Sequence, residues 1–267
     1  MEKETYVGSD GLEHCSFCNK PREKSLKGLS LIGAPSKVRC MCDCEMAAYE
    51  EEVKAFKKRE FEALVSRNRS ICFQNKRMYE WNFAGDDGRN PASAKIKAYV
   101  DSWDKMYSSG VGLLLWGGVG SGKTFLAAAV ANALLDKGKK VLMRDFATIS
   151  NISAFDSDEY VNGLDTYDLL ILDDLGAERK SEFSMQNVFN VINRRWTSGK
   201  PLIITTNLSI NEMKALSISE NVQYQRIYDR IFDTCTPVCI NGASRRKESA
   251  EKKKQKLLAT IEGREDQ

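Results

Sequence analysis

Eight consecutive residues near the middle of the chain have the composition of a phosphate-binding loop. They are Gly117-Gly118-Val119-Gly120-Ser121-Gly122-Lys123-Thr124, which fit the pattern GxxxxGK[ST]. The glycines permit backbone angles closed to other residues, so successive amides can turn toward phosphates at a helix N-terminus. Lys123 adds a positive charge for the β- and γ-phosphates, and the Thr124 hydroxyl is placed to ligate Mg²⁺. A chance glycine-rich turn is the alternative. However, an apolar run precedes the loop, and an Ala-rich stretch beginning at Phe125 follows it. We therefore predict a nucleoside triphosphate site that includes Phe125.

Two acids and an asparagine follow other apolar runs. Leu169-Leu170-Ile171-Leu172 leads directly into Asp173 and Asp174, and the run that begins at Leu202 ends in Asn207. Open α/β sheets place their ligands at the carboxyl ends of their strands. We expect Asp173 to hold Mg²⁺ through water, Asp174 to orient the attacking water, and Asn207 to reach the γ-phosphate or that water. The alternatives are that Asp174 only caps the following turn and that Asn207 is an exposed turn residue.

Two arginines could act on a neighbouring subunit. Arg226 and Arg230 lie four residues apart, so they share one face of a predicted helix, while Ile227 and Ile231 mark a face that can pack on the core. An arginine delivered to the γ-phosphate of a neighbouring copy stabilises the charge that develops in phosphoryl transfer. We predict this role for Arg230, with Arg226 as a supporting contact. Surface ion pairs with Asp229 or Asp233 are the alternative.

The cysteines concentrate at the amino end of the chain. Five of the eight lie between Cys15 and Cys44, in the arrangement Cys15-x-x-Cys18 followed by Cys40-x-Cys42-x-Cys44. Four thiolates make a closed tetrahedral Zn²⁺ site. We predict Cys15, Cys18, Cys42 and Cys44 as ligands, because the last two adjoin the start of a helix, with Cys40 as the alternate. An iron–sulfur cluster remains a second possibility, and His14 is expected to be incidental.

The elements that must position these residues are short strands alternating with helices. Apolar, β-rich runs occupy 111–116, 140–143, 167–172, 201–206 and 237–240. Helical stretches occupy 122–136, 183–198 and 222–233. This alternation predicts an α/β fold with a parallel sheet covered by helices on both faces. Before it we expect a short helix at 92–107, a connecting helix at 45–69 and a small cysteine-rich module, which divides the chain into 1–70 and 71–267.

Composition limits the possible functions only weakly. The hydrophobic fraction of 42%, the charged fraction of 29% and the net charge of +3 are those of a soluble globular protein. The first residues contain no apolar signal segment, and no later stretch is long enough to cross a bilayer. We therefore expect a cytoplasmic protein with no membrane partner.

Taken together, these stretches resemble the DnaC/IstB-like AAA+ ATPase family. The resemblance covers about residues 75–257 and is carried by GLLLWGGVGSGKTFLAAAVANALL, YDLLILDDLGAERKSEFSMQNVFNVINRRW, KPLIITTNLS, RIYDRIF and INGASRRKE. It implies a P-loop NTPase fold that binds and hydrolyses ATP with Mg²⁺. It also implies Lys123 and Thr124 in Walker A, Asp173 and Asp174 in Walker B, Asn207 as sensor 1 and Arg230 as arginine finger. Arg246 is implied as sensor 2, although Arg245 beside it leaves that assignment open by one residue.

Within this family, bacterial and phage helicase loaders commonly carry a cysteine-rich module that binds the replicative helicase. The resemblance therefore implies an oligomer with shared ATP sites that binds a helicase through 1–70, grips single-stranded DNA and loads or remodels the helicase on it. Lys139, Lys140 and the basic stretch 245–256 are candidate DNA contacts, although a solvated tail is an equal alternative for that stretch. Two rival functions remain open: an IstB-like transposase helper ATPase, and a nucleotide-dependent adaptor with negligible turnover, which is suggested by Asp174 where many such ATPases carry Glu.

Overall fold

The protein divides into two compact units. In the computed structural model these are Met1–Ala63 and Leu64–Gln267. The structure describes residues 4–26, 35–153, 157–176, 182–218 and 221–242, together with 251, 254, 255, 257 and 260. Among these residues no helix is both long enough and apolar enough to cross a membrane.

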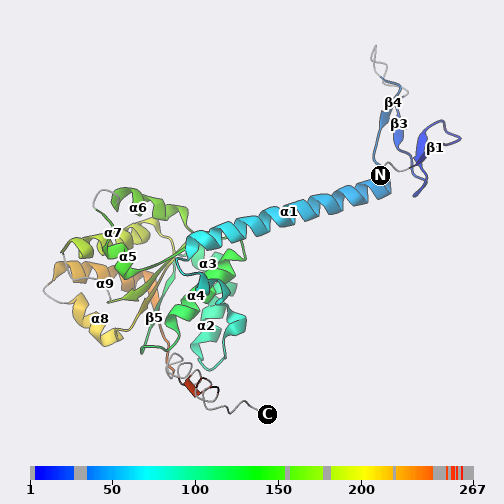
Figure 1. Ribbon diagram of the computed structural model, residues 1–267. Helices are drawn as coiled ribbons and strands as arrows, with labels where there is room; N and C mark the ends of the chain where they lie inside the picture. Colours follow the sequence, from blue (N-terminus) through cyan, green and yellow to red (C-terminus); the bar gives the residue numbers. More distant parts are fainter. Residues whose placement is uncertain are drawn as a thin grey trace. The chain divides into compact units, whose positions relative to one another are not determined.

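The first unit is built from two small hairpins and most of a long helix (Figure 1). Strands β1 (Thr5–Val7) and β2 (Glu13–Cys15) pair antiparallel, as do β3 (Glu23–Ser25) and β4 (Lys37–Arg39). Helix α1 (Asp43–Cys72) follows and contributes residues to both units. Hairpins this short bury little apolar surface.

The second unit is a five-stranded parallel sheet in the order β6-β7-β8-β5-β9. The strands are β5 (Gly112–Trp116), β6 (Val141–Asp145), β7 (Leu169–Leu175), β8 (Leu202–Thr206) and β9 (Cys235–Cys239). Each strand begins and ends within three residues of its predicted range, because buried parallel strands read as continuous apolar runs. The predicted α/β class is confirmed.

Helices cover both faces of this sheet (Figure 1). One face packs against α2 (Ala92–Asp101) and α4 (Lys123–Leu135), and the other against α5 (Phe146–Ser150), α7 (Glu182–Ser198) and α9 (Val222–Thr234). Successive strand residues point to opposite faces, so Leu113 and Leu115 join the first core while Leu114 joins the second. Residues Ala127 to Ala131 of α4 are fully buried, since small side chains let this helix lie close to the sheet.

Several elements differ from the sequence-based expectation. The helix expected over 92–107 is broken at Ser102 into α2 and α3 (Trp103–Ser108). The short elements α5, α6 (Ser157–Gly163), α8 (Ile210–Ser217) and three 3₁₀ turns, η1 (Lys76–Glu80), η2 (Phe83–Gly85) and η3 (Leu164–Thr166), were not predicted. Elements of one or two turns carry too few residues for a periodic pattern to stand out. The sequence also predicts a final helix from residue 245, and this stretch falls largely outside the described residues.

Candidate nucleotide site and metal cluster

The phosphate-binding loop connects β5 to α4 at the carboxyl edge of the sheet. Gly117 has a φ of 145°, and a Cβ atom there would lie 2.4 Å from the Ile240 carbonyl oxygen, so a side chain is excluded on two grounds. Gly122 precedes α4 with a φ of 100°. Within the described chain, the amides of Gly120, Gly122 and Thr124 donate no backbone hydrogen bond. Unpaired amides at a helix N-terminus are the donors that a phosphate group requires.

Lys123 is 7% exposed and its ammonium group is held inside the loop. Its Nζ donates to the carbonyl oxygens of Gly117 and Gly118, both at 2.9 Å, and to Asn207 Oδ1 at 2.8 Å. Asn207 follows β8, so this contact joins residues 84 positions apart in the sequence. The structure thus places the predicted lysine and the predicted asparagine in direct contact.

The predicted acids meet the same cluster from β7. Asp173 Oδ1 accepts hydrogen bonds from the Thr124 hydroxyl at 3.0 Å and from the Thr205 hydroxyl at 2.5 Å. Asn207 Nδ2 donates to Asp174 Oδ1 at 2.9 Å. Five of the predicted residues, Lys123, Thr124, Asp173, Asp174 and Asn207, therefore lie in one hydrogen-bonded network, which Thr205 completes.

Asp173 is buried among hydroxyl groups and other carboxylates. Burial raises its pKa, the Thr205 and Thr124 hydroxyls lower it, and the charges of Asp174 and Asp145 raise it further. An oxygen cluster of carboxylate and hydroxyl groups is the ligand type that Mg²⁺ prefers. The donor set therefore fits a divalent cation at Thr124 and Asp173.

Asp174 is oriented by a local irregularity of the sheet. Its φ is +64°, and the pairing of β7 with β8 shifts register between Leu172 and Leu175. Its amide donates to Thr205 Oγ1 at 2.9 Å, so one hydroxyl contacts both acids. Thr205 was not among the predicted site residues, and the paired threonines at the end of the β8 run are the only signal that the sequence offers for it.

Of the remaining predicted nucleotide contacts, Phe125 lies in the first turn of α4 and packs against Trp81, with ring centroids 6.0 Å apart. Arg246 and its alternate Arg245 fall outside the described residues, as does most of the basic stretch 245–256.

Arg230 lies on α9, and within the described residues it forms no ion pair with Asp229 or Asp233, the carboxylates named as its alternative partners. Its guanidinium group is over the rings of Phe189 and Trp196, and no ion pair of Arg226 or Arg230 is present within the described chain. Asp233 instead accepts a hydrogen bond from Trp196 Nε1 at 2.6 Å.

Four cysteines of the first unit converge. The sulfur atoms of Cys15, Cys18, Cys42 and Cys44 all lie within 4.8 Å of one another. The Cys15–Cys44 and Cys42–Cys44 sulfur separations are 3.6 Å and 3.3 Å. Tetrahedral Zn²⁺ with zinc–sulfur bonds near 2.3 Å requires sulfur separations of about 3.8 Å, so the cluster fits such an ion with small adjustments.

The electrostatics of this cluster differ from one thiol to the next. The amides of Cys18 and Phe17 lower the pKa of Cys15 to about 6, whereas burial raises the pKa of Cys42 to about 12. A bound cation offsets such a desolvation penalty by favouring the thiolate.

The two other candidate ligands of this unit lie outside the cluster. The Cys40 sulfur is 3.7 Å from the Pro21 carbonyl oxygen. His14 Nε2 contacts the Asp10 carboxylate at 3.0 Å.

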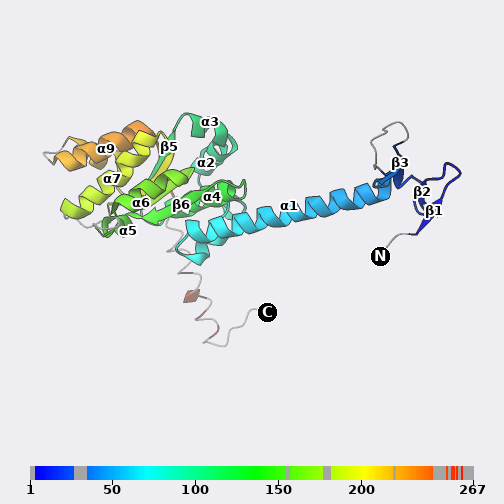
Figure 2. The same ribbon diagram turned by 90° about the horizontal axis from the view of Figure 1, so that it is seen from above.

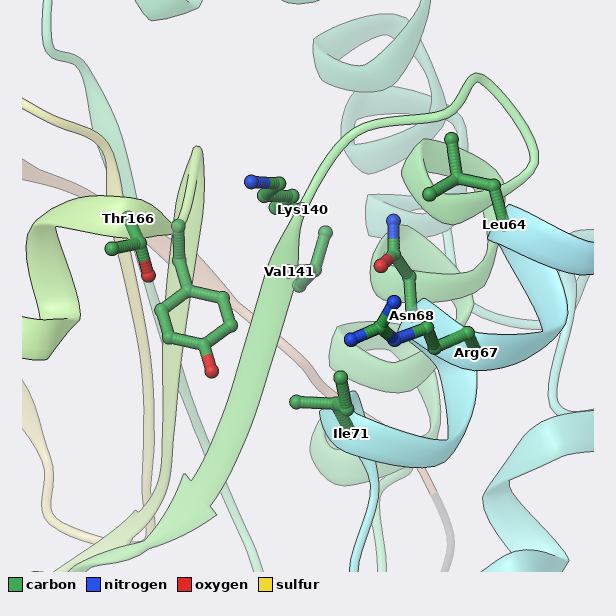
Figure 3. Close-up of a pocket in the computed structure, with 8 residues that line it drawn as sticks. Leu64, Arg67, Asn68, Ile71, Lys140, Val141 and Thr166 are labelled. Atoms are coloured by element: carbon green, nitrogen blue, oxygen red, sulfur yellow. The ribbon is translucent and has the colours of Figure 1, made fainter. Parts of the chain in front are cut away.

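A separate cavity of about 290 Å³ lies beside the amino ends of β6 and β7 (Figure 3). It is lined by Leu64, Arg67, Asn68, Ile71, Lys140, Val141, Thr166 and Tyr167. Lys140 and Tyr167 precede β6 and β7, whereas Asp173 lies at the carboxyl end of β7. None of the predicted nucleotide residues lines this cavity, so it is not the nucleotide site.

Comparison with known protein families identifies the chain. Residues 39–254 match the family model described as IstB-like ATP binding protein. The chain belongs to this family. Nucleotide binding by IstB-like proteins agrees with the loop and acid network described above.

Relatives of the IstB-like chain include proteins of DNA replication and of mobile elements. It is 30% identical over 180 residues to the replicative helicase loader DnaC of Escherichia coli K12, covering 64% of this chain and 70% of the relative. It is 30% identical over 175 residues to the replicative helicase loader DnaI of Bacillus subtilis, covering 60% and 56%. It is also 26% identical over 210 residues to a putative ATP-binding protein, Rv3427c, in an insertion sequence of Mycobacterium tuberculosis, covering 75% and 79%.

Solved structures show the same fold. A crystal structure of DnaI superimposes with a TM-score of 0.56 at 25% identity, covering 67% of this chain and 99% of that chain. A crystal structure of the DnaC helicase loader gives a TM-score of 0.52 at 25% identity, covering 62% and 100%. The predicted P-loop AAA+ architecture of the second unit is confirmed.

Proposed function

We propose that this protein binds ATP with Mg²⁺ and hydrolyses it at the carboxyl edge of its sheet. The observation that carries the proposal is the network joining Lys123 and Thr124 of the loop to Asp173, Asp174 and Asn207. This network brings a phosphate-binding loop together with acids at the carboxyl end of β7, and phosphoryl transfer uses both kinds of group.

The residues of the network have separate roles. Amides of Gly120, Gly122 and Thr124 bind phosphate oxygens, and Lys123 exchanges its contacts with two loop carbonyl groups for contacts with the β- and γ-phosphates. Thr124 and Asp173 would hold Mg²⁺, which supplies charge neutralisation of the phosphates when bound. Asp174, whose Oδ1 is fixed by Asn207, presents its other carboxylate oxygen to orient the attacking water.

Hydrolysis by this arrangement calls for a second copy of the chain. Arg230 lies on α9, and we propose that it acts on ATP bound by a neighbouring subunit, so the protein works as a homo-oligomer. Arg246 is proposed as a further nucleotide contact. Arg230→Ala should retain ATP binding but lose hydrolysis by about a thousandfold or more. Mixing it with Asp174→Ala should restore activity, and failure of this complementation would count against a shared site.

The cysteine cluster is proposed to hold one structural Zn²⁺ through Cys15, Cys18, Cys42 and Cys44. Residues 1–70 would form the helicase-binding module with its connecting helix, and residues 71–267 the ATPase domain. Native mass spectrometry of the full chain should find one zinc, with loss of that zinc on treatment with a chelator. A chain that folds without metal would remove this part of the proposal.

The cellular role that we propose is loading or remodelling of a replicative helicase on single-stranded DNA. Its support is the similarity to DnaC and DnaI, both of which are helicase loaders, together with a cysteine cluster whose geometry fits a metal ion and which precedes the ATPase domain. Lys139 and Lys140 remain candidate DNA contacts.

A transposition helper is the second candidate, favoured by the longer alignment with the insertion-sequence protein. Pull-downs with a purified replicative helicase and a purified transposase, each with and without ATP, separate the two roles. Retention of the transposase alone would reject the loader.

Catalysis itself is tested by ATP turnover with and without single-stranded DNA, in wild type and Asp174→Ala. Turnover that depends on Asp174 supports the ATPase. Absence of turnover in both proteins, with ATP still bound, would instead identify a nucleotide-dependent adaptor.

A further inference from the structure

Helices α7 and α9 lie side by side (Figure 2), and Arg230 of α9 packs against aromatic residues of α7. The guanidinium carbon is 4.9 Å from the centroid of the Phe189 ring and 5.2 Å from that of the Trp196 ring. Nε donates to Asn193 Oδ1 at 2.9 Å. Phe189, Asn193 and Trp196 are spaced four and three residues apart, so they form one face of α7, which we name the arginine cradle.

The cradle is itself fixed in place. Trp196 remains 45% exposed, yet its Nε1 donates to Asp233 Oδ2 at 2.6 Å, one turn beyond Arg230 on α9. Nη1 of Arg230 donates to the Arg226 carbonyl oxygen at 3.1 Å. The flexible arginine side chain is thus restrained by two rings and two hydrogen bonds before any ligand arrives.

These contacts leave the positive charge of Arg230 available to bind a phosphate group. No carboxylate forms an ion pair with it within the described chain, and Nη2 has no hydrogen bond there. Aromatic faces attract a guanidinium group without neutralising it, whereas a carboxylate would compete with phosphate. A cation held in this way can keep its ring contacts while Nη2 binds an oxygen of a phosphate group.

We propose that Phe189, Asn193 and Trp196 are positioning residues that hold Arg230 ready for the triphosphate bound by a neighbouring copy. This inference rests on the proposed function, because it assumes that Arg230 acts between subunits. Restricting the side chain in advance lowers the entropy lost when the transition state forms. The cradle therefore acts on turnover rather than on ATP affinity.

Kinetics of full-length variants test the cradle. Trp196→Leu should lower kcat for DNA-stimulated hydrolysis by about 10- to 100-fold, the loss expected from a misplaced catalytic group, with KM for ATP unchanged. Trp196→Phe keeps an aromatic face and should retain most activity. Phe183→Leu is the matched control, because Phe183 is an exposed aromatic residue of α7 (49% exposed) that is not among the cradle contacts of Arg230.

Subunit mixing separates positioning from damage to the fold. Trp196→Leu has an intact nucleotide site, and Asp174→Ala has an intact cradle but no catalytic acid. A mixture of the two should regain hydrolysis, because the second chain supplies a well-placed arginine to the first. A Trp196→Leu defect that persists in the mixture, or ATP-dependent assembly that fails on size-exclusion chromatography, would overturn the cradle.

The result for Arg230→Ala distinguishes a failure of the shared ATP site from a failure of the arginine cradle. Full activity of Arg230→Ala would reject the shared site and the cradle together. Loss of activity in Arg230→Ala with full activity in Trp196→Leu would leave the shared site standing and reject the cradle alone.

Discussion

The Thr205 hydroxyl is the contact that joins the two acids, and its removal is the sharpest test of the site. It donates to Asp173 Oδ1 at 2.5 Å and accepts from the Asp174 amide at 2.9 Å. Thr205→Val keeps the shape and the strand preference of the side chain but removes both hydrogen bonds. Thr205 is 1% exposed, so water does not replace them.

The expected losses of stability and activity follow from the types of the two hydrogen bonds. A hydrogen bond to a charged group contributes about 1.5–3 kcal/mol and one to a neutral amide about 0.5–1.5 kcal/mol, so the free energy of unfolding should fall by about 2–4 kcal/mol. If the charged bond also stabilises the transition state, kcat/KM should fall by about 10- to 150-fold. Denaturant unfolding followed by tryptophan fluorescence measures the first, since all four tryptophans lie in the second unit.

The same substitution has a predictable pH dependence. Burial already raises the pKa of Asp173, and the Thr205 hydroxyl opposes that rise. Its removal should raise this pKa further. Because the ionised carboxylate is the form that binds Mg²⁺, hydrolysis by the variant should be lost at a higher pH than in wild type as the solution is acidified.

The adjacent threonine supplies the control. Thr206 is also buried, and its hydroxyl donates to the Leu175 carbonyl oxygen at 2.8 Å and accepts from the Leu208 amide at 3.1 Å, without contacting either acid. Thr206→Val should lower stability by about 1–3 kcal/mol but leave kcat/KM near wild type. Equal losses of activity in both variants, or wild-type activity in Thr205→Val, would refute the reasoning.

Three further predictions address other parts of the molecule. Lys123→Ala should abolish ATP-dependent assembly on size-exclusion chromatography, because its ammonium group is the main positive charge facing the phosphates; unchanged assembly would count against the loop. Cys18→Ser should lose zinc in native mass spectrometry while Cys40→Ser keeps it, because only Cys18 belongs to the sulfur cluster, and equal retention would reject the ligand set. Arg195→Met should lower the free energy of unfolding by about 3–5 kcal/mol, since this fully buried guanidinium group donates to four backbone carbonyl groups that would lose this donor. Arg194→Met, which removes a half-exposed ion pair, should lower it by about 1 kcal/mol or less. Similar losses in the two variants would show that burial of the charge is not decisive.

The differences between expectation and structure have separate causes. At the break at Ser102, packing against neighbouring elements outweighs local sequence preference. Helix α8 begins with a capping box formed by Ser209 and Glu212, which is a local sequence signal that apolar periodicity does not register. Thr205 was not predicted as a site residue, because a threonine in a β-rich run is explained equally well by strand preference alone.

The phosphate-binding loop, the acids after the β7 run and the alternation of strands and helices could all be predicted from the sequence. Each depends on residues adjacent in the chain, so a local pattern is enough to recognise it. The hydroxyl group that joins Asp173 to Asp174 and the contacts that hold Arg230 could not be predicted, because they link strands and helices that are neighbours in space but not in sequence. Side-chain direction at such contacts is set by strand register and helix packing, and a linear pattern does not encode either one directly.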